Sequence, residues 1–155
     1  MAAGPFVFSQ ATKLNMFEGA TGLLKTGSAN YRLVLATNSW VPAPSTDELY
    51  SVIGANELAT GFGYTNGGGT LSSVVLSQTG GVVKFTCAAF VWTASGGSIP
   101  LWRYGAVYYL GTLNGKANPL VGYFLGDSTP ADVPATTTGN TLTVTPNASG
   151  ILSAT

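Results

Sequence analysis

The chain has 155 residues, of which 45% are hydrophobic and 8% are charged, and its six basic and six acidic side chains give zero net charge. This length fits one domain, and a chain without clustered Lys and Arg is excluded from using nucleic acid as a main partner. Because ordinary globular proteins carry about 25% charged residues, we expect a surface of Thr, Ser, Gly and Asn that in part faces other subunits.

The first eight residues are apolar and precede any regular pattern. We predict that residues 1–8 form an N-terminal arm, and that Phe6, Val7 and Phe8 insert into a neighbouring subunit or shell. The alternative is that this segment folds back as an edge strand on its own domain. We predict that residues 9–155 form that domain, a single β-sandwich.

A short helix is predicted after the arm. Ser9 can cap it and Gly19 can end it, and helical spacing relates Ala11, Leu14 and Phe17. The next segment, "ANYRLVLATNSW" at 29–40, alternates as a strand with one face formed by Tyr31, Leu33 and Leu35. Trp40 lies in a loop of small and Pro residues, and we predict it either as a subunit contact or as a cap on the end of the sandwich.

The segment "PSTDELYSVIG" at 44–54 predicts a second helix. Ser45 and Glu48 have capping-box spacing, and Gly54 can close the helix. Asp47 and Glu48 then suit the positive end of the helix dipole, which explains this carboxylate pair without catalysis.

From residue 70 onward the pattern indicates β-strands with turns at near-regular spacing. A hairpin is predicted around "QTGG" at 78–81, and Asn114–Gly115 is a strong two-residue hairpin signal. The segment 140–145 alternates inward apolar with outward Thr side chains, and "GILSA" at 150–154 predicts a last strand. The fold class predicted is mainly β, an antiparallel β-sandwich or jelly-roll-like barrel with one or two short helices in the N-terminal half.

Residues 102–109 predict a central strand that is covered on both faces, because both faces are largely apolar. One face would carry Trp102, Tyr104, Ala106 and Tyr108. Arg103 and Tyr109, on the other face, are candidate subunit contacts, since Arg and Tyr are favoured at interface centres. The alternative for both is simple sheet packing.

The sequence offers few groups for catalysis. It contains no histidine, which removes the usual general base near neutral pH, and Cys87 is predicted to be a buried, inert thiol. Gly61 and Gly63 begin a partial dinucleotide fingerprint that fails at Asn66. Turn formation explains Asp127 and Asp132 better than calcium binding does. We therefore predict no enzyme activity, no catalytic residue, no metal site and no cofactor, and we expect neither nucleic acid nor membrane as a partner.

Five segments of the chain resemble a family of small virion proteins of tailed bacteriophages. They are "GYTNGGGTL" (63–71), "VWTASGGSI" (91–99), "RYGAVYY" (103–109), "NPLVGYF" (118–124) and "GNTLTVTPNASGIL" (139–152). Their order and approximate spacing match the family pattern, whereas "PLW" before Arg103 and the long "FVFSQ" arm depart from it. The resemblance implies a structural virion protein of mostly β fold without enzymatic activity.

Within that family, we expect a capsid decoration (cement) protein that stabilises the head by bridging subunits of the major capsid protein. It would be a homo-oligomer, a trimer or a dimer, made in the host cytoplasm and placed on the capsid exterior. The alternative is a tail component: a fibre, baseplate or receptor-binding domain, in which Tyr64 and Asn66 could contact a surface glycan. A polysaccharide-active enzyme is a third hypothesis, and it would require two facing carboxylates about 5–10 Å apart.

Overall fold

A computed structural model describes residues 4–10, 13, 27, 29–79, 82–127, 129, 131–147 and 152–154. The structure is mainly β and its sheets are antiparallel, without a closed barrel. The prediction of a mainly β, sandwich-like fold is therefore confirmed, and its barrel variant is not what the chain forms.

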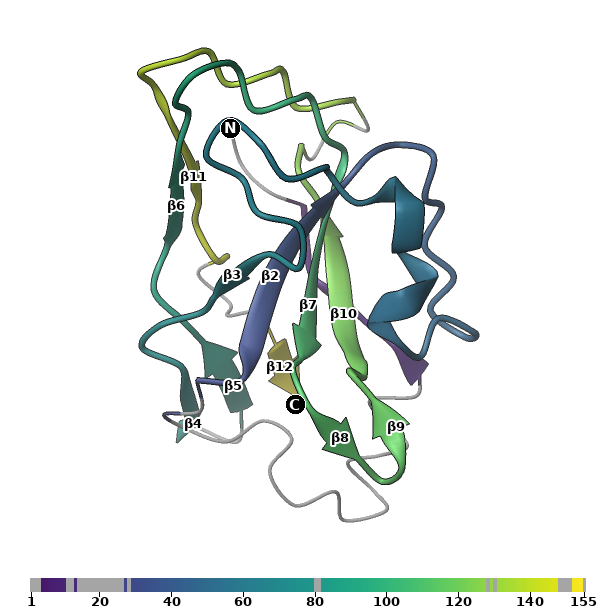
Figure 1. Cartoon of the computed structure of the whole chain (residues 1–155). Helices are drawn as coiled ribbons and strands as arrows, with labels where there is room; N and C mark the ends of the chain where they lie inside the picture. The colour runs from purple at the N-terminus through teal and green to yellow at the C-terminus, as the bar shows by residue number, and fades with distance from the viewer. Residues whose placement is uncertain are drawn as a thin grey trace.

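The main sheet has five strands in the order β1-β10-β7-β2-β3 (Figure 1). Their bounds are β1 Val7–Phe8, β10 Leu120–Leu125, β7 Tyr104–Tyr109, β2 Tyr31–Ala36 and β3 Gly69–Thr70. In β7 the four residues between the terminal tyrosines are all buried. The prediction of a central strand covered on both faces is confirmed: β7 pairs with β10 along one edge and with β2 along the other, and side chains on both of its faces are buried.

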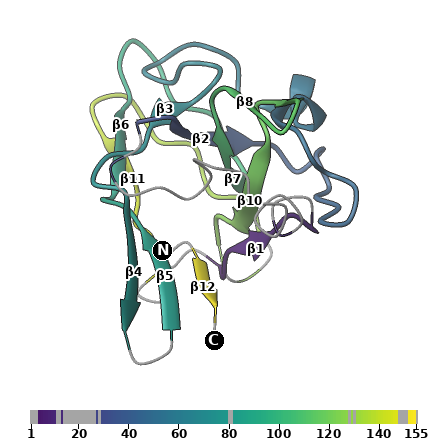
Figure 2. The ribbon, with the colours of Figure 1, turned by 90° about the horizontal axis from the view of Figure 1, so that it is seen from below.

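Smaller sheets surround the main one. β4 (Val75–Thr79), β5 (Val82–Thr86) and β12 (Leu152–Ala154) form one of them, and β6 (Phe90–Thr93) pairs with β11 (Thr141–Val144) in another. Figure 2 shows β4, β5 and β12 grouped apart from the main sheet. The Asn114–Gly115 hairpin is confirmed between β8 (Thr112–Leu113) and β9 (Lys116–Ala117), with both turn residues at positive φ.

The two faces of the main sheet pack against different partners. Leu33, Leu35 and Val107 face a large cluster that also contains side chains of β5, β6 and β11, such as Phe85, Trp92 and Leu142. The opposite face packs under the loop of residues 40–58 in a second cluster: Val34, Ala36, Trp40, Ile53, Ala106, Tyr108 and Leu120. The main sheet is thus the middle layer between small sheets and a long loop (Figure 1).

Trp102 differs from the prediction that it shares a face with Tyr104, Ala106 and Tyr108. It precedes β7, forms an isolated bridge with Val133, and packs in the large cluster instead. Pairing with a segment outside the main sheet turns this residue to the other side of the sheet.

The helix predicted over 44–54 is wrong. The chain makes a turn at 44–46 and then two 3-10 helices, η1 at Tyr50–Val52 and η2 at Gly54–Asn56. Leu49 is extended and bridges to Pro119, while the carbonyl of Glu48 accepts from the Leu120 N–H at 2.8 Å. Pairing with residues 118–120 holds this stretch extended where the capping box would begin a helix.

The first predicted helix lies mostly outside the described residues. Gln10 and Lys13 are helical, and the Ser9 hydroxyl donates to the Asp47 carbonyl at 2.8 Å. Among the residues that the structure describes, no helix has the length and apolarity to cross a membrane.

Candidate functional site

The predicted N-terminal arm belongs to the main sheet. Val7 pairs with Tyr123 and Phe8 with Gly122, so β1 is an edge strand on β10. The Phe6 ring centroid lies 6.3 Å from that of Phe124, and both Phe6 and Phe8 pack against the large cluster. Residues 7 and 8 therefore form an edge strand on the chain's own domain, which was the alternative to an arm that inserts into a neighbouring subunit. Of Phe6, Val7 and Phe8, Val7 is the exposed one, with 36% of its surface accessible.

Trp40 is buried rather than presented as a contact. Its exposed fraction is 4%, and its ring meets Tyr104 and Tyr123 edge to face at centroid separations of 5.6 and 5.9 Å. Three aromatic rings thus close this end of the second cluster. Trp40 serves as the packed cap that was the alternative to a subunit contact.

Arg103 and Tyr109 lie at opposite ends of β7 and do not form one patch. The Arg103 Nε donates to Asp132 Oδ1 at 2.7 Å, and Asn38 donates to the other Asp132 oxygen at 3.2 Å. The Tyr109 hydroxyl accepts from Asn30 Nδ2 at 2.9 Å. Both residues are partly exposed, and one polar atom of each binds a group within the chain. Their role as subunit contacts stays a prediction.

The most elaborate polar site is a cluster around Glu57, which the sequence analysis missed. Glu57 is 6% exposed, and its Oε1 accepts from the Tyr64 hydroxyl and the Gly67 N–H, each at 2.7 Å. The hydroxyl of Tyr50 donates to Oε2. A buried carboxylate needs several such donors to offset its lost hydration, and here it receives three.

This Glu57 cluster ties the 50–68 loop to the main sheet. The Tyr64 hydroxyl accepts from the Leu35 N–H of β2 at 3.0 Å, and the Tyr108 hydroxyl of β7 donates to the Gly67 carbonyl at 2.9 Å. The rings of Tyr50 and Tyr108 stack with centroids 4.3 Å apart. The cluster therefore acts as an internal clamp.

The electrostatics of the clamp favour protonated phenols. Burial raises the pKa of Tyr64 and of Tyr50 far above the ordinary value, and the Glu57 carboxylate adds to both shifts. Burial also raises the pKa of Tyr108. These hydroxyls stay donors at all physiological pH values, which suits a structural role. Because Tyr64 is only 1% exposed, it is not accessible as a contact for a surface glycan.

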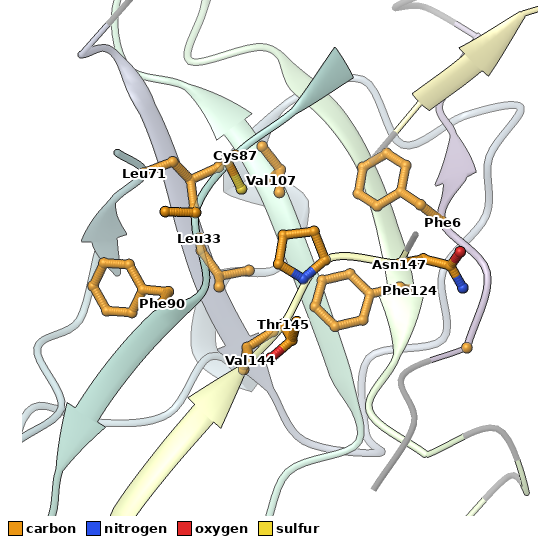
Figure 3. Close-up of a pocket in the computed structure, with 13 residues that line it drawn as sticks. Phe6, Leu33, Leu71, Cys87, Phe90, Val107, Phe124, Val144, Thr145 and Asn147 are labelled. Carbon is orange, nitrogen blue, oxygen red and sulfur yellow. The ribbon is translucent and has the colours of Figure 1, made fainter. Parts of the chain in front are cut away.

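An apolar cavity of about 40 Å³ lies between the main sheet and the segment after β11 (Figure 3). Leu33, Val107 and Phe124 project into it from the sheet, and Val144 and Asn147 close it from the other side. Small-molecule sites usually occupy 300–1,000 Å³, so this space is a packing gap of about one water. Cys87 lines it half-buried, and burial raises the pKa of its thiol to about 11, consistent with a thiol of low reactivity.

The acidic residues within the described part of the chain do not gather into a metal site, since no group of three or more potential ligands occurs there. The Asp127 carboxylate accepts a hydrogen bond from the Thr129 N–H, whereas the Asp132 carboxylate forms an ion pair with Arg103. No family model, no curated protein and no solved structure matches the chain.

Proposed function

We propose that this chain is a structural, non-catalytic virion protein that decorates a tailed-phage capsid as a homo-oligomer and bridges subunits of the major capsid protein. The observation that supports this most is a pair of antiparallel segments, residues 90–102 and 133–144, which we call the uncharged ladder. It comprises β6 and β11 and continues through bridges at Ile99–Thr136 and Trp102–Val133. Neither segment contains a charged residue.

The uncharged ladder exposes apolar side chains. Val91 is 51% exposed and Leu101 47%. Phe62, 49% exposed, lies over Gly97, where an added Cβ would meet its ring at 2.2 Å. A soluble monomer normally keeps mixed charges across its surface. Burial of such side chains against a neighbour contributes about 25 cal/mol per Å², and many copies on a lattice strengthen retention by multivalency.

The surroundings of the carboxylates also favour a structural role over a catalytic one. Glu57 is enclosed by its three donors, Glu48 pairs with Lys116 at 2.6 Å, and Asp132 pairs with Arg103. Asp47 accepts from the Ala43 N–H at 2.8 Å. Each of these carboxylates has a partner within the chain, which favours a structural role for it.

The placement on a phage capsid rests on the five sequence segments that resemble tailed-phage virion proteins. The chain's β fold and its uncharged ladder are compatible with that placement. The tail alternative receives no particular support from the Tyr64–Asn66 region, because Tyr64 is enclosed in the Glu57 cluster.

Fractionation of purified phage particles tests the proposal. Particles from a lysate that contains the chain would be banded, heads and tails separated, and each fraction assayed for the chain by quantitative mass spectrometry. We expect copies in the head fraction in a fixed ratio to the major capsid protein. A tail-only location would overturn the capsid role, and absence from particles would overturn the virion role altogether.

A further inference from the structure

The outer edge of β11 carries backbone groups that bind no partner among the residues that the structure describes. In the β6–β11 ladder, Leu142 stands opposite Trp92 and Thr143 opposite Val91. The Ala94 N–H donates to the Asn140 carbonyl at 2.9 Å, which fixes the alternation. Since hydrogen-bonded and non-hydrogen-bonded pairs alternate, the N–H and C=O groups of Thr141 and Thr143 point away from β6.

This edge is open in the part of the chain that the structure describes. β11 pairs only with β6 there, and the backbone groups of Thr141 and Thr143 bind no other described segment. Both side chains are exposed. Two donors and two acceptors therefore point away from β6 at alternate positions of one strand, and Thr143 borders a space of about 70 Å³ that Trp102, Gly126 and Val133 also line.

The edge also lacks the usual protection against pairing. Natural proteins guard edge strands with Lys, Pro, bulges or inward charges. Residues 133–155 contain no charged side chain, and the run "TLTVT" at 141–145 contains no proline. Thr and Val favour extended strands, and β11 keeps regular register over its whole length. Such an edge is a template for another strand.

We propose that β11 pairs with β11 of a second copy of this chain, antiparallel across a two-fold axis through Leu142. Thr141 then lies opposite Thr143 of the second copy, and each such pair exchanges two N–H···O=C hydrogen bonds. The two pairs related by the axis make about four hydrogen bonds, following the antiparallel rule. The product is a continuous four-stranded sheet, β6-β11-β11-β6.

A second copy is the favoured occupant because the edge is self-complementary. An isologous contact brings the same patch to both sides, and here a donor at one position meets an acceptor at the other. A charged edge would repel its own copy, whereas both strands of this ladder and the whole chain have zero net charge. The pairing goes beyond the proposed function, since it depends on the edge alone and not on a capsid.

The first test is the oligomeric state of the purified chain. Light scattering after size exclusion, run at several concentrations, should give a mass that rises toward twice 15.8 kDa. Thr143→Pro removes an outward N–H without touching the β6 ladder, and we expect at least tenfold weaker dimerisation. Val91→Pro removes the equivalent outward N–H of β6 and should leave dimerisation unchanged. Retained dimers in Thr143→Pro, or a monomer at all concentrations, would overturn the proposal.

If Thr143→Pro does not fold, a pair of charged substitutions tests the same strand pairing. Thr143→Lys alone should weaken dimerisation, and Thr141→Glu/Thr143→Lys should restore it, because the two new side chains face each other only in this register. Failure of the double variant to recover would contradict the register. Neither experiment uses phage particles, so failure here and failure of the capsid role are separate results.

Discussion

Replacement of Glu57 by alanine tests whether the clamp holds the 50–68 loop to the sheet. The change leaves the Tyr64 hydroxyl and the Gly67 N–H without the acceptor that each reaches at 2.7 Å, and it also removes the partner of Tyr50. A hydrogen bond to a charged group contributes about 1.5–3 kcal/mol. The two bonds from Tyr64 and Gly67 together therefore contribute about 3–6 kcal/mol.

Urea denaturation followed by tryptophan fluorescence measures this loss. For a slope of about 2 kcal/mol per M, the midpoint should fall by about 1.5–3 M. Glu48→Ala is the matched control: its partner Lys116 lies 2.6 Å away, but the Glu48 side chain is 45% exposed. Such a surface pair contributes less than about 1 kcal/mol. If Glu57→Ala were no more destabilising than Glu48→Ala, the clamp would not be the tether described.

Four further predictions follow from the same structure. Burial raises the folded-state pKa of Tyr64 above its unfolded value, so the contribution of Tyr64 to the free energy of unfolding should be constant below about pH 10 and should fall above it. Above pH 10 the free energy of unfolding should therefore fall less steeply in Tyr64→Phe, and an identical slope in the two proteins would contradict this. Cys87, with a pKa of about 11, should be alkylated by iodoacetamide at pH 8.5 at least tenfold more slowly than in urea; equal rates would show an open thiol. Gly105→Ala places a Cβ 2.2 Å from the Phe124 ring. The substitution should lower the free energy of unfolding, measured by urea denaturation, by about 1–3 kcal/mol. Phe6→Ala should lower the free energy of unfolding by about 2 kcal/mol, whereas Val7→Ala should lower it by less than about 0.5 kcal/mol. Equal effects would contradict the packing of Phe6 against the core.

Local patterns predicted much of the β architecture. The alternation in β2 and β11 and the Asn114–Gly115 turn are set by neighbours in sequence, and they were found where expected. The two apolar faces of β7 also predicted its central position. These signals depend on periods of two residues, which any strand with buried faces must show.

Other features depend on contacts that no local pattern contains. The capping box at Ser45 and Glu48 gave way to pairing with residues 118–120, about seventy positions away. Trp40 looked exposed because its partners, Tyr104 and Tyr123, lie far along the chain. The role of Glu57 could not be predicted, because the fold of its loop brings the hydroxyls of Tyr50 and Tyr64 to its carboxylate.

The open edge of β11 belongs to the same class of feature. Alternation predicted the strand and its outward Thr side chains, but only the sheet order shows that its second edge has no neighbour among the described strands. The sequence shows that no charged residue follows Asp132. Only the sheet order shows that this uncharged segment contains an open strand edge.

Cryo-electron microscopy of intact virions that contain the chain tests the central claim, a structural capsid role, most directly. We predict density for this β domain repeated over the capsid lattice, in contact with the major capsid protein through the uncharged ladder. Density confined to the tail, or capsids on which the chain has no regular position, would contradict that role.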